Sequence, residues 1–331
     1  MMRIGTWLHD VPKTKEDIDT TVGKLAAMGV NCLITSFKNW TGPTFYPSQI
    51  AYTEEGFEDP ALYGRLIDRC HEAGIQFEAW TCTFPESGRS KLLEDHPECR
   101  VTTADGKEYR VEGNGIAWAC PASDLTQEYE LALCREVLEF YPQIDGLHLD
   151  YIRFPSAEVC RCEHCRQEFS SRYGFDLARD NGRDGVPSFD AFVRWRCGHI
   201  RRFVDRAASV TRLAGVRLSA AVFPYYPSIM YDMGQDWVDW CHSGLLDAAY
   251  PMNYNWSDLM VGRYTQVHKL LLAGTATVVC QGLSVTRGIT APVLRQLGQA
   301  ALDRGSQGLI FFEARGLMEL PNDTLRPFVA G

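Results

Sequence analysis

The sequence predicts a single (β/α)8 TIM barrel, an α/β fold, and two observations carry that prediction. Short, mostly apolar strand-like segments alternate with helix-like segments along the whole chain, which indicates parallel strands covered by helices on their outer face. Eight such units can be traced, and eight strand–helix units close into a barrel of typically about 250 residues. A doubly wound open sheet is the alternative, but no Gly-rich phosphate-binding turn follows the first strand.

Each predicted element is bounded by ordinary signals for its type. Gly29, Gly215 and Gly305 follow helix-like segments at the position of a left-handed C-cap, and Ser123 or Asp124 can cap the start of another helix. The predicted strands cover residues 3–9, 30–38, 75–84, 144–155, 216–224, 245–254, 276–285 and 307–315. The predicted helices cover residues 15–28, 60–73, 123–141, 190–213, 235–242, 257–273 and 291–304.

Two long connections account for most of the residues beyond a minimal barrel. They cover about residues 85–121, after the third strand, and 155–189, after the fourth. Both leave the C-terminal ends of adjacent strands, so both should overhang the same side of the barrel rim. Because no internal repeat or low-complexity linker interrupts the chain, we expect one domain over residues 1–331.

Composition and charge narrow the class of protein. The chain is 45% hydrophobic and 23% charged, which fits an enzyme with a sizeable core. The formal net charge of −9 argues against a nucleic-acid or anionic-membrane surface, since phosphate neutralisation needs clustered Lys and Arg. No secretory signal and no apolar run of about 18 residues is visible. We therefore expect a cytoplasmic protein without nucleic-acid or membrane partners, for which a homo-oligomer remains open.

The segment IDGLHLDYIRFP, residues 144–155, places charge at the end of an apolar strand. Side chains alternate between the faces of a strand, so its leucines should pack on a covering helix while His148 and Asp150 point inward and towards the C-terminal rim. Active sites of α/β barrels lie at that rim, and an unpaired buried carboxylate is costly. We interpret Asp150 as a catalytic or substrate-binding residue. An Asp150–Arg153 ion pair that closes the following turn is the alternative.

Glycoside hydrolysis usually requires a second carboxylate that faces the same cleft. Glu313 is the best candidate, because it closes the alternating set Leu309, Phe311, Glu313 at the end of the eighth strand. A buried salt bridge of Glu313 with Arg315 or Arg287 explains the residue equally well.

Other polar residues gather near the predicted rim. Asp236 follows the fifth strand and is a third catalytic candidate, although helix N-capping accounts for it as easily. Glu78 sits deeper and is interpreted as a core carboxylate paired with Lys38 or His148. Aromatic faces stack on pyranose rings, and amides bond to sugar hydroxyls, so several rim residues suit a sugar. The predicted substrate-binding residues are His148, Arg153, Trp80, Asn253 and Tyr254.

Four of the 12 cysteines are spaced like metal ligands. Three of them form a C-x-C-x-x-C motif, Cys160, Cys162 and Cys165. Zinc prefers four tetrahedral ligands, and Cys120, at the end of the other long connection, is the first choice for the fourth, with Cys99 and His164 as alternatives. Four protein ligands leave no open position, which predicts a structural zinc that joins the two connections. Reduced thiols without a metal are the alternative.

The chain resembles a known family in four segments that cover most of its length in order. DGLHLDYIRFP, residues 145–155, resembles the D-G-[IL]-H-[LF]-D-Y-[IV]-R-[FY]-P signature of the glycosyl-hydrolase-like family 10 group. The other similar segments are Ala79-Trp80, Gln235-Asp236-Trp237 and Pro251-Met252-Asn253-Tyr254. The resemblance implies a TIM barrel that acts on glycans, with Asp150 as the leading catalytic candidate.

A narrower resemblance concerns the cysteines. Cys120-Pro121, followed by the C-x-C-x-x-C motif, is similar to the zinc site of glycoside hydrolase family 42 β-galactosidases, and this resemblance supports Cys120 as the fourth ligand. The fourth strand here ends in His-Leu-Asp and lacks the Asn-Glu pair that carries the acid of that family. Neither its mechanism nor its β-galactoside specificity therefore transfers.

The sequence thus leads to the hypothesis of a glycoside hydrolase that acts on a carbohydrate substrate. Asp150 would be the nucleophile or charge stabiliser, and Glu313, or as second choice Asp236, the acid/base. Arg153 would hold Asp150 ionised, because a nearby cation lowers the pKa of a carboxylate. The alternative is a non-catalytic glycan-binding barrel. A metal-dependent deacetylase would need an open His/Asp metal site, and no such group of residues is visible at the strand ends.

Overall fold

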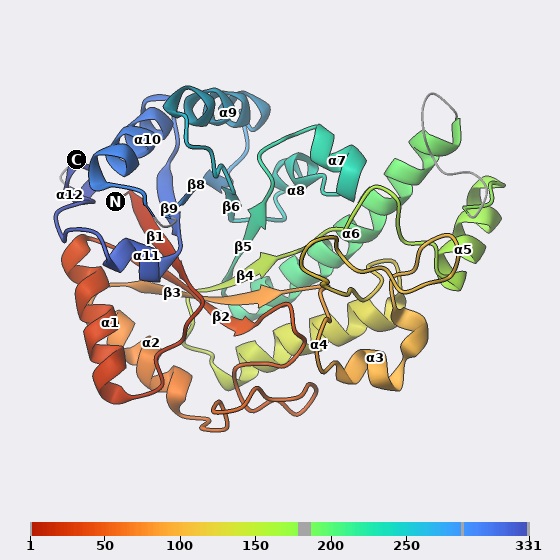
Figure 1. Cartoon of the computed structure of the whole chain (residues 1–331), viewed down its shortest axis with the longest axis horizontal. Helices are drawn as coiled ribbons and strands as arrows, with labels where there is room; N and C mark the ends of the chain where they lie inside the picture. Colours follow the sequence, from red (N-terminus) through yellow and green to blue (C-terminus); the bar gives the residue numbers. More distant parts are fainter. Residues whose placement is uncertain (1, 178–186, 286–287, 330–331) are drawn as a thin grey trace.

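The alternating segments of the sequence fold into a barrel of parallel strands surrounded by helices (Figure 1). This computed structural model describes residues 2–177, 187–285 and 288–329. Neighbouring strands follow the order β7-β6-β5-β4-β3-β2-β1-β9-β8, and each strand pairs with its neighbours in parallel. The predicted TIM barrel is confirmed.

The elements lie close to the predicted segments. The strands are β1 (Arg3–Leu8), β2 (Cys32–Lys38), β3 (Gln76–Cys82), β4 (Gly146–Asp150), β5 (Arg217–Val222), β6 (Ala248–Pro251), β7 (Val278–Val279), β8 (Gln281–Ser284) and β9 (Gly308–Phe312). The helices are α1 (Lys15–Met28), α2 (Leu62–Glu72), α3 (Lys91–Asp95), the 3₁₀ turn η1 (Pro97–Cys99), α4 (Asp124–Phe140), α5 (Glu163–Tyr173), α6 (Pro187–Ala214), α7 (Ser228–Met233), α8 (Trp237–His242), α9 (Asp258–Leu271), α10 (Ala291–Asp303), α11 (Ala314–Met318) and α12 (Arg326–Val329). Ser123 caps α4 by accepting the Thr126 N–H.

The barrel closes at its seventh strand, which is broken into two pieces. Instead of the single strand expected over residues 276–285, β7 pairs with β6 and β8 pairs with β9, with Cys280 between them. A bridge between Met252 and Gly282 joins the two edges. A Cβ at Gly282 would lie 3.0 Å from the carbonyl oxygen of Pro251 and 3.2 Å from the Trp7 ring, so this close approach of the strands depends on glycine.

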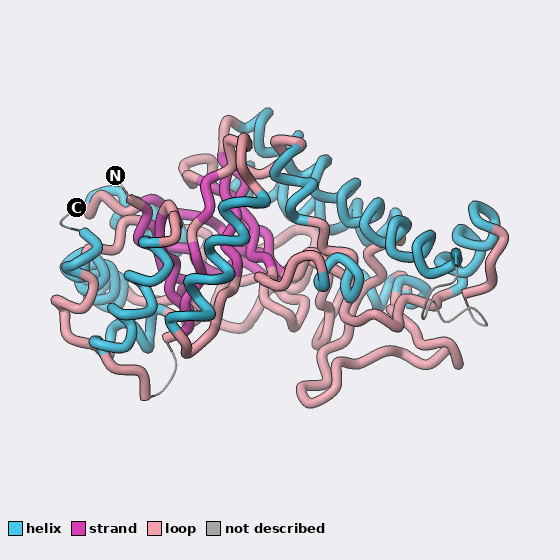
Figure 2. Tube along the Cα trace, turned by 90° about the horizontal axis from the view of Figure 1, so that it is seen from above, coloured by secondary structure: helices cyan, strands magenta, loops and turns pink. Residues whose placement is uncertain are grey.

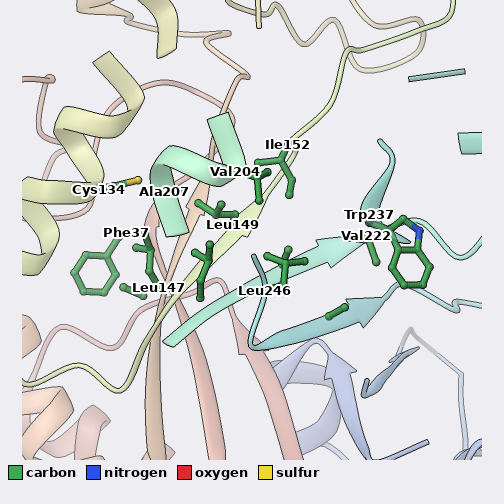
Figure 3. Packing of buried hydrophobic residues seen from close by; sticks show 14 of the residues in the cluster. Phe37, Cys134, Leu147, Leu149, Ile152, Val204, Ala207, Val222, Trp237 and Leu246 are labelled. Carbon is green, nitrogen blue, oxygen red and sulfur yellow. The ribbon is translucent and has the colours of Figure 1, made fainter. Parts of the chain in front are cut away.

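The alternation of side chains along the strands separates two hydrophobic layers. Leu147 and Leu149 of β4 face outward and lie beside Val204 and Ala207 of α6 (Figure 3). Inward-facing side chains form a smaller core inside the barrel, which includes Trp7, Ile34, Trp80, Ala221, Tyr250 and Ile310. His148 lies in this interior, as the alternation predicts, with its ring 5.9 Å from that of Trp7.

Two insertions extend the barrel beyond its C-terminal rim. One joins β3 to α4 and carries α3 and η1, and the other joins β4 to α6 and carries α5. They lie side by side at one end of the molecule (Figures 1 and 2), and the Arg161 N–H donates to the Thr102 carbonyl oxygen at 2.8 Å. Residues 178–186 of the predicted 155–189 connection lie outside the described residues. Within the described part of the chain, no helix combines the length and the apolar character needed to cross a membrane.

Candidate active site

A cavity of about 290 Å³ lies at the C-terminal end of the barrel. Its walls come from the ends of the strands and the loops that follow them, and they are mostly aromatic or apolar. The lining residues are Trp7, Trp40, Trp80, Asp150, Tyr151, Arg153, Ala221, Phe223, Met252, Tyr254 and Phe312. Such an apolar cavity with a few convergent polar groups is typical of a small-molecule or substrate site.

Asp150 is the last residue of β4, and among the described residues it is the one carboxylate in the cavity lining. Its side chain is nearly buried, since the residue is only 8% exposed. One of its oxygens, Oδ1, accepts the Tyr151 N–H at 2.6 Å. Burial raises the pKa of Asp150 to about 6, although the Tyr151 N–H, the Arg153 charge and the Trp80 side chain each lower it. A carboxyl group with this pKa can donate or accept a proton near neutral pH.

The chain turns sharply directly after Asp150. Tyr151 has a φ of 54°, in the left-handed region that bulky side chains rarely adopt. The Arg153 N–H closes the turn on the Tyr151 carbonyl oxygen at 2.9 Å. This turn brings the side chains of Tyr151 and Arg153 into the cavity beside Asp150. Backbone strain of this kind is concentrated at functional sites.

Arg153 stands near Asp150 without forming an ion pair with it. Its guanidinium lies 4.9 Å, 5.1 Å and 5.0 Å from the ring centroids of Trp118, Tyr151 and Phe223. No carboxylate oxygen of the described residues lies within 4.0 Å of the guanidinium, so the expected alternative of a closing Asp150–Arg153 ion pair is wrong. Arg153 lowers the pKa of Asp150, as expected, but burial outweighs this effect and keeps the pKa above its ordinary value.

His148 lies beneath the cavity and supports one of its walls. Its Nε2 accepts the indole N–H of Trp7 at 3.1 Å, and its Nδ1 lies 2.8 Å from Ser219 Oγ, which in turn donates to Glu78 Oε2 at 2.6 Å. This network assigns the proton of the ring to Nδ1. Burial lowers the pKa of His148 to about 4, so the ring is neutral. The geometry therefore gives His148 a role in positioning Trp7.

Glu78 is paired inside the barrel, but not with the expected lysine. Its Oε1 lies 2.5 Å from Arg3 Nη1, whereas Lys38 pairs with Glu86 at 2.8 Å and Glu130 at 2.9 Å. The predicted Glu78–Lys38 pairing is therefore wrong. The expected alternative partner, His148, is in place: its Nδ1 lies 3.9 Å from Glu78 Oε2, and the Ser219 hydroxyl also links the two side chains.

Glu313 is not among the residues that line the cavity. In β9 the inward-facing side chains are Ile310 and Phe312, whereas Leu309 and Phe311 pack outward with the surrounding helices. Glu313 lies beyond the end of β9, at the N-cap position of α11, so the alternation along the strand does not extend to it. Its side chain is half-buried in front of α11, and burial raises its pKa.

Arg315 and Arg287 are the salt-bridge partners that the sequence suggests for Glu313. Arg315 pairs with Asp10 at 3.7 Å instead, and Arg287 lies outside the described residues.

Asp236 and Asn253 are engaged in the scaffold around the cavity. Asp236 caps α8 by accepting the Asp239 N–H at 3.5 Å, and it also accepts the Tyr226 hydroxyl at 3.2 Å. Asn253 is fully buried and donates to Gln281 Oε1 at 3.1 Å. Neither side chain lines the cavity, so the capping interpretation accounts for Asp236.

The structure brings three predicted sugar-binding residues together and adds others. Trp80, Tyr254 and Arg153 line the cavity with Asp150. Sequence reasoning missed Trp40, which follows β2 by two residues and could have been found with the same strand-end rule that identified Asp150.

Cys120, Cys160, Cys162 and Cys165 form one buried cluster whose sulfur atoms all lie within 4.8 Å of one another. The distances from Cys165 Sγ to Cys120 Sγ and Cys162 Sγ are 3.3 Å and 3.4 Å. A tetrahedral zinc with bonds of about 2.3 Å separates its sulfur ligands by roughly 3.8 Å, so these residues fit a structural zinc. The alternatives are engaged elsewhere: Cys99 Sγ contacts Ser123 Oγ at 3.4 Å, and His164 Nε2 contacts the Ala122 carbonyl oxygen at 3.1 Å.

Comparison with known proteins places the chain in a family. The model of the family described as glycosyl hydrolase-like 10 matches residues 4–286. The chain belongs to this glycosyl hydrolase-like 10 family. A comparison with curated proteins finds no match.

Solved structures similar to this glycosyl hydrolase-like 10 barrel include several glycosidases. A β-galactosidase from Bacillus circulans sp. alkalophilus superimposes with a TM-score of 0.69 and 15% identity over 94% of this chain and 50% of that chain. The α-L-fucosidase isoenzyme 2 from Paenibacillus thiaminolyticus superimposes with a TM-score of 0.69 and 14% identity over 99% of this chain and 48% of that chain. The catalytic domain of a β-amylase from Paenibacillus polymyxa superimposes with a TM-score of 0.63 and 11% identity over 97% of this chain and 94% of that chain. The chain spans about half the length of the first two, and at these identities the likeness establishes the fold alone.

In this glycosyl hydrolase-like 10 protein, the segment that carries the family resemblance forms β4 and the turn after it. Asp150, Tyr151 and Arg153, which all belong to that segment, converge on one cavity. The segment therefore builds one wall of the candidate site.

Proposed function

We propose that this protein is a glycoside hydrolase that cleaves a glycosidic bond in the rim cavity. The observation that carries the proposal is the environment of Asp150, a nearly buried carboxyl group whose pKa burial raises to about 6, in an aromatic cavity at the end of a barrel strand. Catalytic groups with pKa values near the working pH are found at such sites.

Asp150 acts in this proposal as the proton donor to the leaving oxygen. A carboxyl group with a pKa near 6 is partly protonated close to neutral pH, whereas a nucleophile or charge stabiliser should be ionised. The faces of Trp80 and Tyr254 would stack on a sugar ring. The described lining contains no second carboxylate that could act as nucleophile or base, so the attacking group would come from the substrate itself, as in substrate-assisted glycosidases.

The cysteine cluster is proposed to hold a structural zinc ion. Four thiols within 4.8 Å of one another are buried at the contact of the two insertions, and together they supply a complete set of sulfur ligands. When bound, the metal would join the insertions and take no part in the reaction, since no coordination position would remain open.

Turnover by the Asp150→Asn variant tests the proposed function. A panel of chromogenic glycosides and oligosaccharides identifies a substrate, and the variant is then expected to fold normally and lose at least about a hundredfold in kcat, the lower range for a general acid. Glu313→Gln is the matched control and should retain most activity, because Glu313 does not line the cavity. Wild-type turnover in Asp150→Asn would rule out the assignment.

A non-catalytic glycan-binding barrel is the second candidate, and the single carboxylate in the described lining favours it. It predicts that calorimetry detects binding of an oligosaccharide while no product is released, and that Asp150→Asn changes binding by less than about tenfold.

A further inference from the structure

We infer that the substrate carries an anionic group, a carboxylate or a sulfate ester on the sugar, and that the Arg153 guanidinium binds it. The inference rests on the proposed function and adds the chemical class of the ligand. It starts from an imbalance in the cavity: Arg153 brings a full positive charge to the lining, and no carboxylate among the described residues neutralises it by direct contact.

The hydrogen-bond donors of Arg153 are only partly used by the protein. Nη1 donates to the Phe154 carbonyl oxygen and to Met233 Sδ, both at 3.2 Å. The Nε and Nη2 groups donate to none of the described residues, and neither is sealed off from solvent. A guanidinium offers five donors in a planar fork, which fits the paired oxygens of a carboxylate or sulfate.

A second buried arginine shows what a purely structural role looks like in this chain. Arg196 is fully buried, and it donates to the carbonyl oxygens of Ser156 at 2.9 Å and Asp232 at 3.1 Å and to that of Tyr231. Its guanidinium therefore joins two backbone segments, the one at Ser156 and the end of α7, to α6. Arg153 instead borders an open cavity and keeps one edge of its guanidinium free of protein acceptors.

The aromatic rings around Arg153 make cation–π contacts with its guanidinium but do not neutralise its charge. Trp118, Tyr151 and Phe223 surround the guanidinium at about the distance of cation–π contacts, which offset only part of the cost of removing a cation from water. Burial lowers the pKa of Arg153 but leaves the group protonated at any physiological pH. An anion supplied by the ligand would complete the site.

The position of Arg153 is also compatible with the role proposed for Asp150. An anionic group bound close to Asp150 disfavours its ionised form and so keeps the proton on a group that must donate it. Arg153 would therefore bind the anionic group of the substrate, and the bound anion would keep Asp150 protonated.

Binding of matched sugar pairs to the intact protein tests the inference without requiring turnover. Isothermal titration calorimetry would compare glucuronic acid with glucose, galacturonic acid with galactose, and galactose 6-sulfate with galactose. We expect at least one anionic sugar to bind about tenfold or more tightly than its neutral partner, the effect of one charged hydrogen-bonded contact. Preference for the uronic acid or for the sulfate identifies the group.

Three variants assign this preference to Arg153. Arg153→Met keeps an unbranched apolar stem without the charge and should reduce the ratio of dissociation constants to about one, whereas Arg153→Lys should retain part of it. Arg263→Met removes the same charge from the exposed face of α9 and should leave the ratio unchanged.

The outcomes separate the inference from the proposed function. Equal or tighter binding of the neutral sugars by the wild-type protein overturns the anionic substrate and leaves the hydrolase standing. A preference that persists in Arg153→Met overturns the role of Arg153 and also leaves the hydrolase standing. If none of these sugars binds and no glycoside is cleaved, both proposals fail.

Discussion

At the scale of single residues, the site depends on two buried groups whose neutral forms are favoured by burial, so that their pKa values shift in opposite directions. Asp150 is shifted towards its protonated form, while His148 is shifted towards its neutral form and fixes the indole of Trp7. The alternation of the β4 sequence predicted that both residues face inward. It could not predict their protonation states, because these depend on Trp7, Ser219 and other residues brought in by distant strands.

The raised pKa of Asp150 predicts a pH-dependent gain in stability for Asp150→Asn. Burial raises this pKa from 3.8 to about 6, so the folded state is favoured while the group is protonated and loses stability as pH rises through 6. At pH 8 the variant should exceed the wild type by up to about 3 kcal/mol in free energy of unfolding, and the difference should vanish below pH 4. Urea denaturation at both pH values measures it, and an equal difference at both would contradict the account.

The same reasoning predicts that His148 does not titrate in the neutral range. Its folded-state pKa of about 4 lies below the ordinary 6.5, so the neutral ring stabilises the fold above pH 6.5, and this contribution is lost as pH falls towards 4. The ring Cε1–H resonance, assigned by comparison with His148→Gln, should stay constant from pH 8 to pH 5 in NMR spectra. A midpoint near 6.5 would show that the ring is not held neutral.

At the scale of elements, the first insertion contacts the cavity lining through Arg153, which lies at the start of the second insertion. Trp118 lies two residues before Cys120 and packs against Arg153, which connects the cysteine cluster to the cavity. The C-x-C-x-x-C spacing predicted the three clustered thiols, and the end of the other connection suggested the fourth. The contact of Trp118 with Arg153 could not be predicted, since it depends on how the insertions lie against each other.

Metal content and stability test the cysteine cluster. The purified protein should contain about one zinc per chain by X-ray fluorescence, and Cys120→Ser should lose most of it together with several degrees in Tm, because a structural zinc contributes to folding free energy. Cys70→Ser replaces a buried cysteine of α2 outside the cluster and should keep the metal. A wild-type protein with well below one metal per chain would end the zinc proposal.

A buried charge cluster ties β2 to α4 and to the first insertion. Lys38 is 1% exposed and pairs with Glu86 and Glu130, and burial raises the pKa of Glu130 despite the lysine. Lys38→Met should therefore cost about 3–5 kcal/mol at pH 8, because two carboxylates lose their cation, and less at pH 5.

The controls for Lys38 come from the same chain. Lys91→Met, which breaks the exposed pair with Asp95, should cost at most about 0.5 kcal/mol, and Glu130→Gln should restore part of the stability of Lys38→Met. Chemical denaturation of these variants measures their free energies of unfolding. An unchanged free energy of unfolding in Lys38→Met would show that the cluster does not stabilise the fold.

At the scale of the whole molecule, the repeated strand–helix pattern was sufficient to predict the barrel. The break of the seventh strand at Cys280 was not predicted, since a run of apolar residues does not reveal which neighbour each half pairs with. The Glu313 prediction depended on side-chain parity near the end of β9. That alternation does not extend to Glu313, because β9 ends at Phe312 and Glu313 precedes α11.

Closure of the barrel predicts a strong position dependence for glycine substitutions. A Cβ at Gly308 would clash with the carbonyl oxygen of Arg3, so Gly308→Ala should force β1 and β9 apart and cost about 1–3 kcal/mol. Gly23 lies within α1, where the added carbon would meet no atom within 4 Å apart from its chain neighbours and the backbone of its own helix. Gly23→Ala should therefore stabilise the protein by about 0.5–1 kcal/mol. Similar effects at both sites in thermal denaturation would contradict this account.

The central claim is that a glycan binds and reacts in the cavity beside Asp150, and a crystal structure of Asp150→Asn with an oligosaccharide tests it most directly. The account predicts a sugar ring against Trp80 and Tyr254, with a glycosidic oxygen about 3 Å from the side chain at position 150. A glycan bound elsewhere on the molecule, with this cavity empty, would contradict it.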